Sequence, residues 1–242
     1  DPNRPGVPLP DLEFVANAVK DVEFLSQSLL GQMSNISADW VKKQKGRAGE
    51  ADVWRLRAQV CQAELFGYAS VRDGPERAVP RLIERLRREP TDALVGHSLG
   101  GLIALEALRA APELAVTRVV CLGSPLRGSL TARNLAARPW ARQLLGRSAP
   151  LLQGGLQRWE GVAEVGVVAG DRARGMGRLF ARFDGGSDGT VGLDETRLPG
   201  LTDHCIVHSS HTGLVLSAAA VRQTAHFLRH GRFEYAVETP AV

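Results

Sequence analysis

From about residue 50, short apolar runs alternate with longer stretches in which apolar side chains recur every three or four positions. The short runs are typical of buried strands, and the three- and four-residue spacing is typical of amphipathic helices. The clearest helix follows a start signal at residues 73–76, where a proline and acidic side chains precede the apolar stripe of Val79, Leu82, Ile83 and Leu86. The pattern therefore predicts repeated strand–helix units.

The expected elements can be placed by residue number. Strands are predicted at 60–68, 93–95, 118–122, 162–168 and 205–207, and helices at 73–89, 99–111, 131–145 and 215–229. The segment 93–95 is interpreted as a short buried strand. Such alternation predicts an α/β fold with a mostly parallel sheet covered by helices on both faces.

Residues 1–49 have a different character. Four prolines in residues 1–10 predict an extended arm, and the apolar spacing over 12–29 predicts an amphipathic helix. All four lysines fall within the first 45 residues, and 25 arginines follow with no further lysine. We therefore predict an atypical N-terminal segment over 1–49 and one domain over 50–242. The helix is expected to pack on that domain; a homodimer in which it completes a neighbouring chain is the alternative.

Composition narrows the class of protein. The chain has 242 residues, of which 44% are hydrophobic and 23% charged, which is typical of a globular protein. The net charge of +4 comes from scattered arginines, so no nucleic-acid partner is expected. The longest nearly apolar stretch, 213–221, is too short to span a membrane. Three cysteines without a Cys-x-x-Cys pair argue against a disulfide framework and against a zinc site. Because no signal peptide is recognised, a cytoplasmic protein is expected.

The sharpest chemical signal is the sequence Gly96-His97-Ser98-Leu99-Gly100, which stands between a predicted strand and a predicted helix. A serine on so tight a turn needs glycine two positions away on either side, because larger side chains would collide. The turn would expose the Ser98 hydroxyl and place the Leu99 amide at a helix start, where it can stabilise an oxyanion. The alternative is a glycine-rich turn without chemistry.

A nucleophilic serine needs a histidine base and an acid that orients it, and in this fold they follow the serine in the order acid, then histidine. His211 precedes the closing helix and is the preferred base. His204 and His208, on or beside the last strand, remain alternatives for the base. If they are not the base, they are expected to support the catalytic residues or to have structural roles. The other histidines are expected to be structural or surface groups: His97, His226 and His230.

The preferred acid is Asp188, in the glycine-rich loop 185–191. Asp184 is its competitor, and an ordinary Asp-Gly turn is the non-catalytic alternative for Asp188. Asp171 is interpreted as a turn residue. Asp194 and Glu195 are interpreted as the start of a helix or turn.

Four stretches of this chain, 93–101, 122–129, 187–191 and 211–214, resemble the α/β-hydrolase superfamily, in particular its small bacterial esterase and lipase-like members. The resemblance covers about residues 50–233. It implies an α/β-hydrolase-like fold, a small-molecule ester as substrate, and neither a metal nor an organic cofactor.

The resemblance also implies roles for single residues. Ser98 would be the nucleophile, Asp188 the orienting acid, His211 the base and Leu99 one oxyanion donor. The segment 123–129 is similar to the loop that borders the substrate pocket in lipase-like members. It thereby offers Gly123 and Ser124 as oxyanion or substrate-binding residues.

The chain departs from the family pattern at its front. Members normally have an early central strand ending in a His-Gly-type loop that gives a second oxyanion N–H, and nothing of that kind precedes residue 60. The sequence thus predicts a serine hydrolase of carboxylic esters with a helical segment in place of the early strands. The alternatives are an acyltransferase or amidase with the same triad, and a catalytically impaired domain used for binding or assembly. The segment 133–158 is read as a lid or as an ordinary helix and loop.

Overall fold

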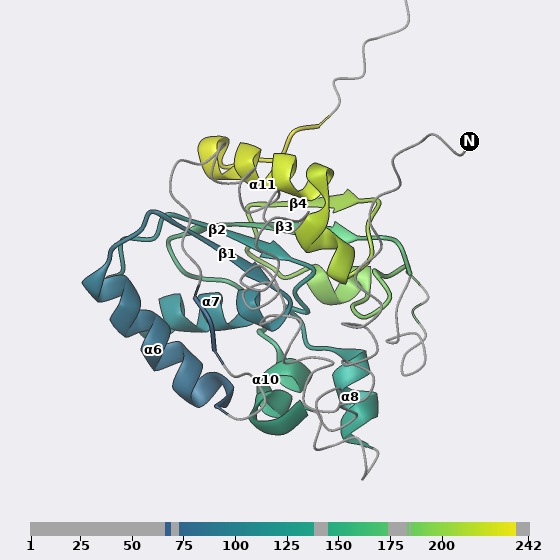
Figure 1. Cartoon of the computed structure of the whole chain (residues 1–242), viewed down its shortest axis with the longest axis horizontal. Helices are drawn as coiled ribbons and strands as arrows, with labels where there is room; N and C mark the ends of the chain where they lie inside the picture. Colours follow the sequence, from purple (N-terminus) through teal and green to yellow (C-terminus); the bar gives the residue numbers. More distant parts are fainter. Residues whose placement is uncertain (1–65, 69–72, 138–144, 174–182, 184, 236–242) are drawn as a thin grey trace, which may run out of the picture.

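The computed structural model describes residues 66–68, 73–137, 145–173, 183 and 185–235 (Figure 1). Its sheet has four parallel strands in the order β1-β2-β3-β4. The strands are β1 (Ala93–His97), β2 (Arg118–Leu122), β3 (Glu164–Gly170) and β4 (Asp203–Val207). The predicted α/β fold with a parallel sheet is confirmed.

Helices cover the sheet on both faces, as predicted (Figure 1). Helices α6 (Gly74–Arg88) and α7 (Leu99–Ala110) pack together on one side, and α11 (Ala218–His230) contacts β2 and β3 on the other. The shorter elements are α8 (Leu130–Ala136), η2 (Gly146–Ser148), α10 (Ala149–Gly154), η4 (Leu193–Thr196) and η5 (Thr212–Leu216).

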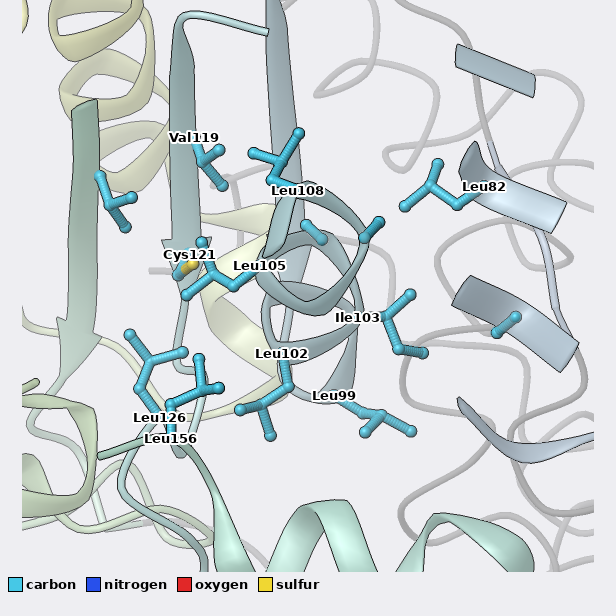
Figure 2. Close-up of a cluster of buried hydrophobic side chains, with 14 of the residues drawn as sticks. Leu82, Leu99, Leu102, Ile103, Leu105, Leu108, Val119, Cys121, Leu126 and Leu156 are labelled. Atoms are coloured by element: carbon cyan, nitrogen blue, oxygen red, sulfur yellow. The ribbon is translucent and has the colours of Figure 1, made fainter. Parts of the chain in front are cut away.

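Strand β2 divides the core in two, because successive side chains of a strand point to opposite faces. Val119 and Cys121 join the larger apolar cluster, in which Leu102, Leu105 and Leu108 of α7 take part (Figure 2). The alternate β2 residues, Val120 and Leu122, join the smaller cluster against α11, which also holds the buried side chains of Val168 and Phe227. The apolar run of β2 is thus explained by burial on both faces.

Several sequence predictions need correction. The segment 93–95 was expected to be buried, but Val95 is 43% exposed, because β1 is an edge strand of the sheet that the structure describes. Residues 66–68 have no regular secondary structure, and 60–65 of that predicted strand lie outside the described residues. The closing helix is in fact two elements, η5 and α11, separated at Ser217, whose hydroxyl accepts a hydrogen bond from the Ala220 amide.

Two further predictions fall outside the described residues: the arm and amphipathic helix of 1–49, and most of the second half of the predicted 131–145 helix. The described first half of that helix is α8, which begins at Leu130, directly after the N-cap residue Ser129. None of the helices in the described part of the chain is long and apolar enough to cross a membrane.

Candidate active site

Ser98 occupies the turn between β1 and α7 with φ of 54° and ψ of −122°. It is the one non-glycine residue with positive φ in the described part of the chain. Such a conformation costs on the order of 1–3 kcal/mol and is retained mainly at functional sites. A Cβ atom at Gly96 would lie 2.5 Å from the backbone of Gly100 and Gly101, so the predicted steric need for glycine before the serine is confirmed. The same prediction for Gly100 is wrong, because a Cβ atom there would meet only the Tyr68 hydroxyl oxygen, at an ordinary 3.8 Å.

The backbone around Ser98 is held from both sides. The Ser98 amide donates to the Leu122 carbonyl oxygen at 2.9 Å, and the Gly101 amide donates to the Ser98 carbonyl at 3.2 Å. Leu99 is the first residue of α7, where amides have no partner within the helix and lie at the positive end of its dipole. This is the position that an oxyanion donor needs.

Asp188 and His211 form a hydrogen bond of 2.6 Å between Oδ2 and Nδ1, and each residue is 1% exposed. The His211 amide also donates to the Asp188 carbonyl at 2.9 Å. The other carboxylate oxygen of Asp188 accepts the amides of Thr190 at 2.9 Å and Val191 at 2.8 Å. Because a carboxylate only accepts, Nδ1 of His211 carries a proton, and Nε2 is the ring nitrogen that can act as the base.

The serine turn and the Asp188–His211 pair meet at the carboxyl end of β2. Leu122 holds the Ser98 amide, and the next residue, Gly123, lies against the pair: a Cβ atom there would be 3.0 Å from Asp188 Oδ2 and 3.2 Å from His211 Nδ1. The structure therefore brings all three predicted triad residues to one edge of the sheet, where parallel α/β folds carry their sites.

Ser98 and His211 do not form a hydrogen bond in this structure. The buried Ser98 Oγ and the buried His211 Nε2 each lack a partner among the described residues. Buried polar atoms are nearly always paired, so two orphaned atoms in one region point to chemistry. A bond between nucleophile and base often tightens only when substrate binds.

Gly123 and Ser124, which follow β2, make contacts with the two neighbouring strands. The Gly123 amide donates to the Val168 carbonyl at 2.9 Å, and the Ser124 hydroxyl donates to the Gly96 carbonyl at 3.5 Å. These contacts hold Gly123 to β3 and Ser124 to β1. A role of either residue in binding substrate stays a prediction.

The alternative histidines and the acid Asp171 contact residues other than the predicted triad. His204 Nε2 hydrogen-bonds the Thr196 hydroxyl at 2.8 Å, and burial, aided by the charge of Arg197, lowers its pKa to about 4. His208 Nδ1 pairs with Asp171 at 2.9 Å on the exposed surface. Asp184 lies outside the described residues.

Asp194 and Glu195 lie in the first turn of η4, as predicted for the start of a helix or turn. Glu195 has in addition a structural role that its local sequence does not indicate. Its carboxylate accepts the Leu130 amide at the start of α8 and, at 2.8 Å, the Gly192 amide. The Thr131 hydroxyl donates to the Thr190 carbonyl at 2.7 Å. These bonds tie the loop of Asp188 to α8, and burial raises the pKa of Glu195. Leu130 is 65 residues distant, so no local pattern reveals the contact.

No metal centre is evident in the described part of the chain, where no three His, Cys, Asp or Glu side chains gather in a ligating arrangement.

Comparisons with solved structures agree with this fold. A lipase from Bacillus licheniformis in its propeptide form is 23% identical, with 71% of this chain and 43% of that chain covered and a TM-score of 0.52. Its mature form is 22% identical, with coverages of 64% and 71% and a TM-score of 0.47. A phospholipase from Legionella pneumophila is 15% identical, with coverages of 84% and 55% and a TM-score of 0.51.

At these identities the similarity to the propeptide-form lipase and to the phospholipase shows the fold alone. The chain spans about half the length of the propeptide-form lipase and of the phospholipase. No curated protein matches the sequence significantly.

The family comparison covers nearly the whole chain. The model of the alpha/beta hydrolase family matches residues 12–236 and so runs across much of the segment 1–49. The division of the chain at residue 49 stays a prediction. On the fold and on this match, the chain belongs to the α/β hydrolase family.

Proposed function

We propose that this protein is a serine hydrolase that cleaves carboxylic esters of small molecules through an acyl-enzyme on Ser98. The observation that carries the proposal is the buried Asp188–His211 hydrogen bond beside the strained Ser98 turn. Membership of the α/β hydrolase family supports it. The triad roles rest on this geometry and on the chain order of the three residues.

In the first half of the reaction, Ser98 Oγ attacks the ester carbonyl carbon and His211 Nε2 takes the hydroxyl proton. The carbonyl oxygen becomes an oxyanion, which the Leu99 amide stabilises. As the intermediate collapses, the C–O bond breaks and His211 gives its proton to the leaving alcohol. Asp188 stabilises the imidazolium and fixes the ring orientation.

In the second half, His211 takes a proton from water as the water oxygen attacks the acyl-enzyme. The second tetrahedral intermediate collapses, the carboxylic acid leaves, and the proton returns to Ser98 Oγ. Acyl transfer would differ only in the acceptor, because an alcohol or amine would replace the water.

The proposal is tested by turnover of p-nitrophenyl acetate and butyrate. Ser98→Ala should lose at least about 10³-fold in kcat, because removal of a triad member leaves only residual catalysis. The matched control is Ser217→Ala, which removes another serine hydroxyl, at the start of α11, and should leave kcat unchanged. Equal turnover by wild type and Ser98→Ala would refute the proposal. Transfer product formed with added alcohols or amines would identify an acyltransferase instead.

A further inference from the structure

The side chain of His97, at the end of β1, contacts the proposed base His211. His97 is the last residue of β1, directly before Ser98, and is 8% exposed. Its Nε2 lies 3.0 Å from the His211 carbonyl oxygen, 114 residues away. The two imidazole rings also pack together, with centroids 4.7 Å apart and planes tilted by 46°.

The direction of this hydrogen bond is fixed by chemistry. A carbonyl oxygen can only accept, so His97 Nε2 carries a proton and donates it. His97 therefore holds His211 without competing for the Nε2 atom of His211 that must receive the serine proton.

Within the described part of the chain, the other hydrogen bonds of the His211 ring and amide are to Asp188. Asp188 accepts both its Nδ1–H, at 2.6 Å, and its backbone amide, at 2.9 Å. Those bonds fix His211 relative to the acid loop, and His97 fixes it relative to the nucleophile turn. Proton transfer depends on the position of His211 relative to the Ser98 turn, because an error of about 1 Å in position can cost about 10²-fold in rate.

We propose that His97 is a positioning residue that holds the base His211 in register with Ser98 through its Nε2–H bond to the His211 carbonyl. The inference rests on the proposed function, since it assigns His97 its part in that reaction. Ring packing against His211 is secondary in this account, and the hydrogen bond supplies the register.

Two substitutions separate the hydrogen bond from the ring contact. His97→Gln keeps an N–H donor at nearly the same distance from the backbone but removes the ring. His97→Phe keeps an aromatic ring but removes the donor. Ester turnover is measured for both, with kcat and KM separated, together with the proton NMR signal of the His211 Nδ1–H in its bond to Asp188.

We expect His97→Phe to lower kcat at least about tenfold with little change in KM, and to shift or broaden the Nδ1–H signal. His97→Gln should restore most of kcat and a wild-type signal. Equal kcat and an unshifted signal in both variants would overturn the proposal, as would equal losses in both. If wild type turns over no ester but the signal moves only in His97→Phe, the proposed function fails while the positioning of His211 by His97 stands.

Discussion

Gly123→Ala tests how closely the Asp188–His211 pair is packed against β2. Gly123 has φ of 52°, and an added Cβ would lie 2.7 Å from Leu214 Cδ1, 3.0 Å from Asp188 Oδ2 and 3.2 Å from His211 Nδ1. Ordinary contacts between carbon atoms are about 3.5–4.0 Å. The methyl group would therefore push directly on both members of the pair.

The expected cost can be estimated term by term. A left-handed conformation costs a non-glycine residue about 1–2 kcal/mol, and overpacking a buried site costs about 1–3 kcal/mol. Replacing glycine by alanine recovers about 0.4–1 kcal/mol through the unfolded chain. The free energy of unfolding should thus fall by about 1–5 kcal/mol, which is a fall in Tm of roughly 2–18 °C for a chain of this size.

Urea unfolding and ester turnover measure the two consequences of Gly123→Ala. Turnover should fall about 10–100-fold, because the imidazole must move away from the methyl group. Gly154→Ala is the matched control: nothing lies within 4 Å of its added Cβ, and it should be neutral or slightly stabilising. Wild-type stability and wild-type turnover in Gly123→Ala would refute the packing described at the site.

Two further predictions concern stability and pH. Burial lowers the pKa of His204 from 6.5 to about 4, so its contribution to stability is complete above pH 6.5 and is lost as the pH falls toward 4. In urea unfolding, His204→Gln should reduce the dependence of the free energy of unfolding on pH in this range. An unchanged dependence would contradict the assignment. Burial raises the pKa of Glu195 above its ordinary 4.5, so its contribution falls as the pH rises through the raised value. Glu195→Gln should lower the free energy of unfolding by about 1–3 kcal/mol, because one amide loses its acceptor, and this deficit should shrink as the pH rises; a deficit that grows with pH would contradict the account.

Local sterics explain why the Ser98 turn was predictable from sequence. The glycine at position 96 follows from backbone collisions within five residues, and the helix after the serine follows from its apolar spacing. The alternation of strands and helices was also predictable, because the spacing of apolar residues is a local feature of the sequence. Chain order and loop context were enough to choose Asp188 and His211, which the structure joins by a hydrogen bond.

Contacts between distant segments were not predictable. The bond from His97 to the His211 carbonyl spans 114 residues, and that from Leu130 to Glu195 spans 65. Such contacts depend on how loops meet at the sheet edge, and no residue pattern near either partner encodes them. The exposure of Val95 is similar, because it depends on the place of β1 in the sheet and not on the apolar run that forms the strand.

The central claim is that Ser98 is an activated nucleophile served by His211. It is tested most directly by a fluorophosphonate probe, with the modified residue located by peptide mapping. We expect a single adduct on Ser98 in wild type, and labelling slowed by at least about 10³-fold in His211→Ala. No adduct on Ser98 in the folded wild-type protein, or equal labelling in His211→Ala, would contradict the account.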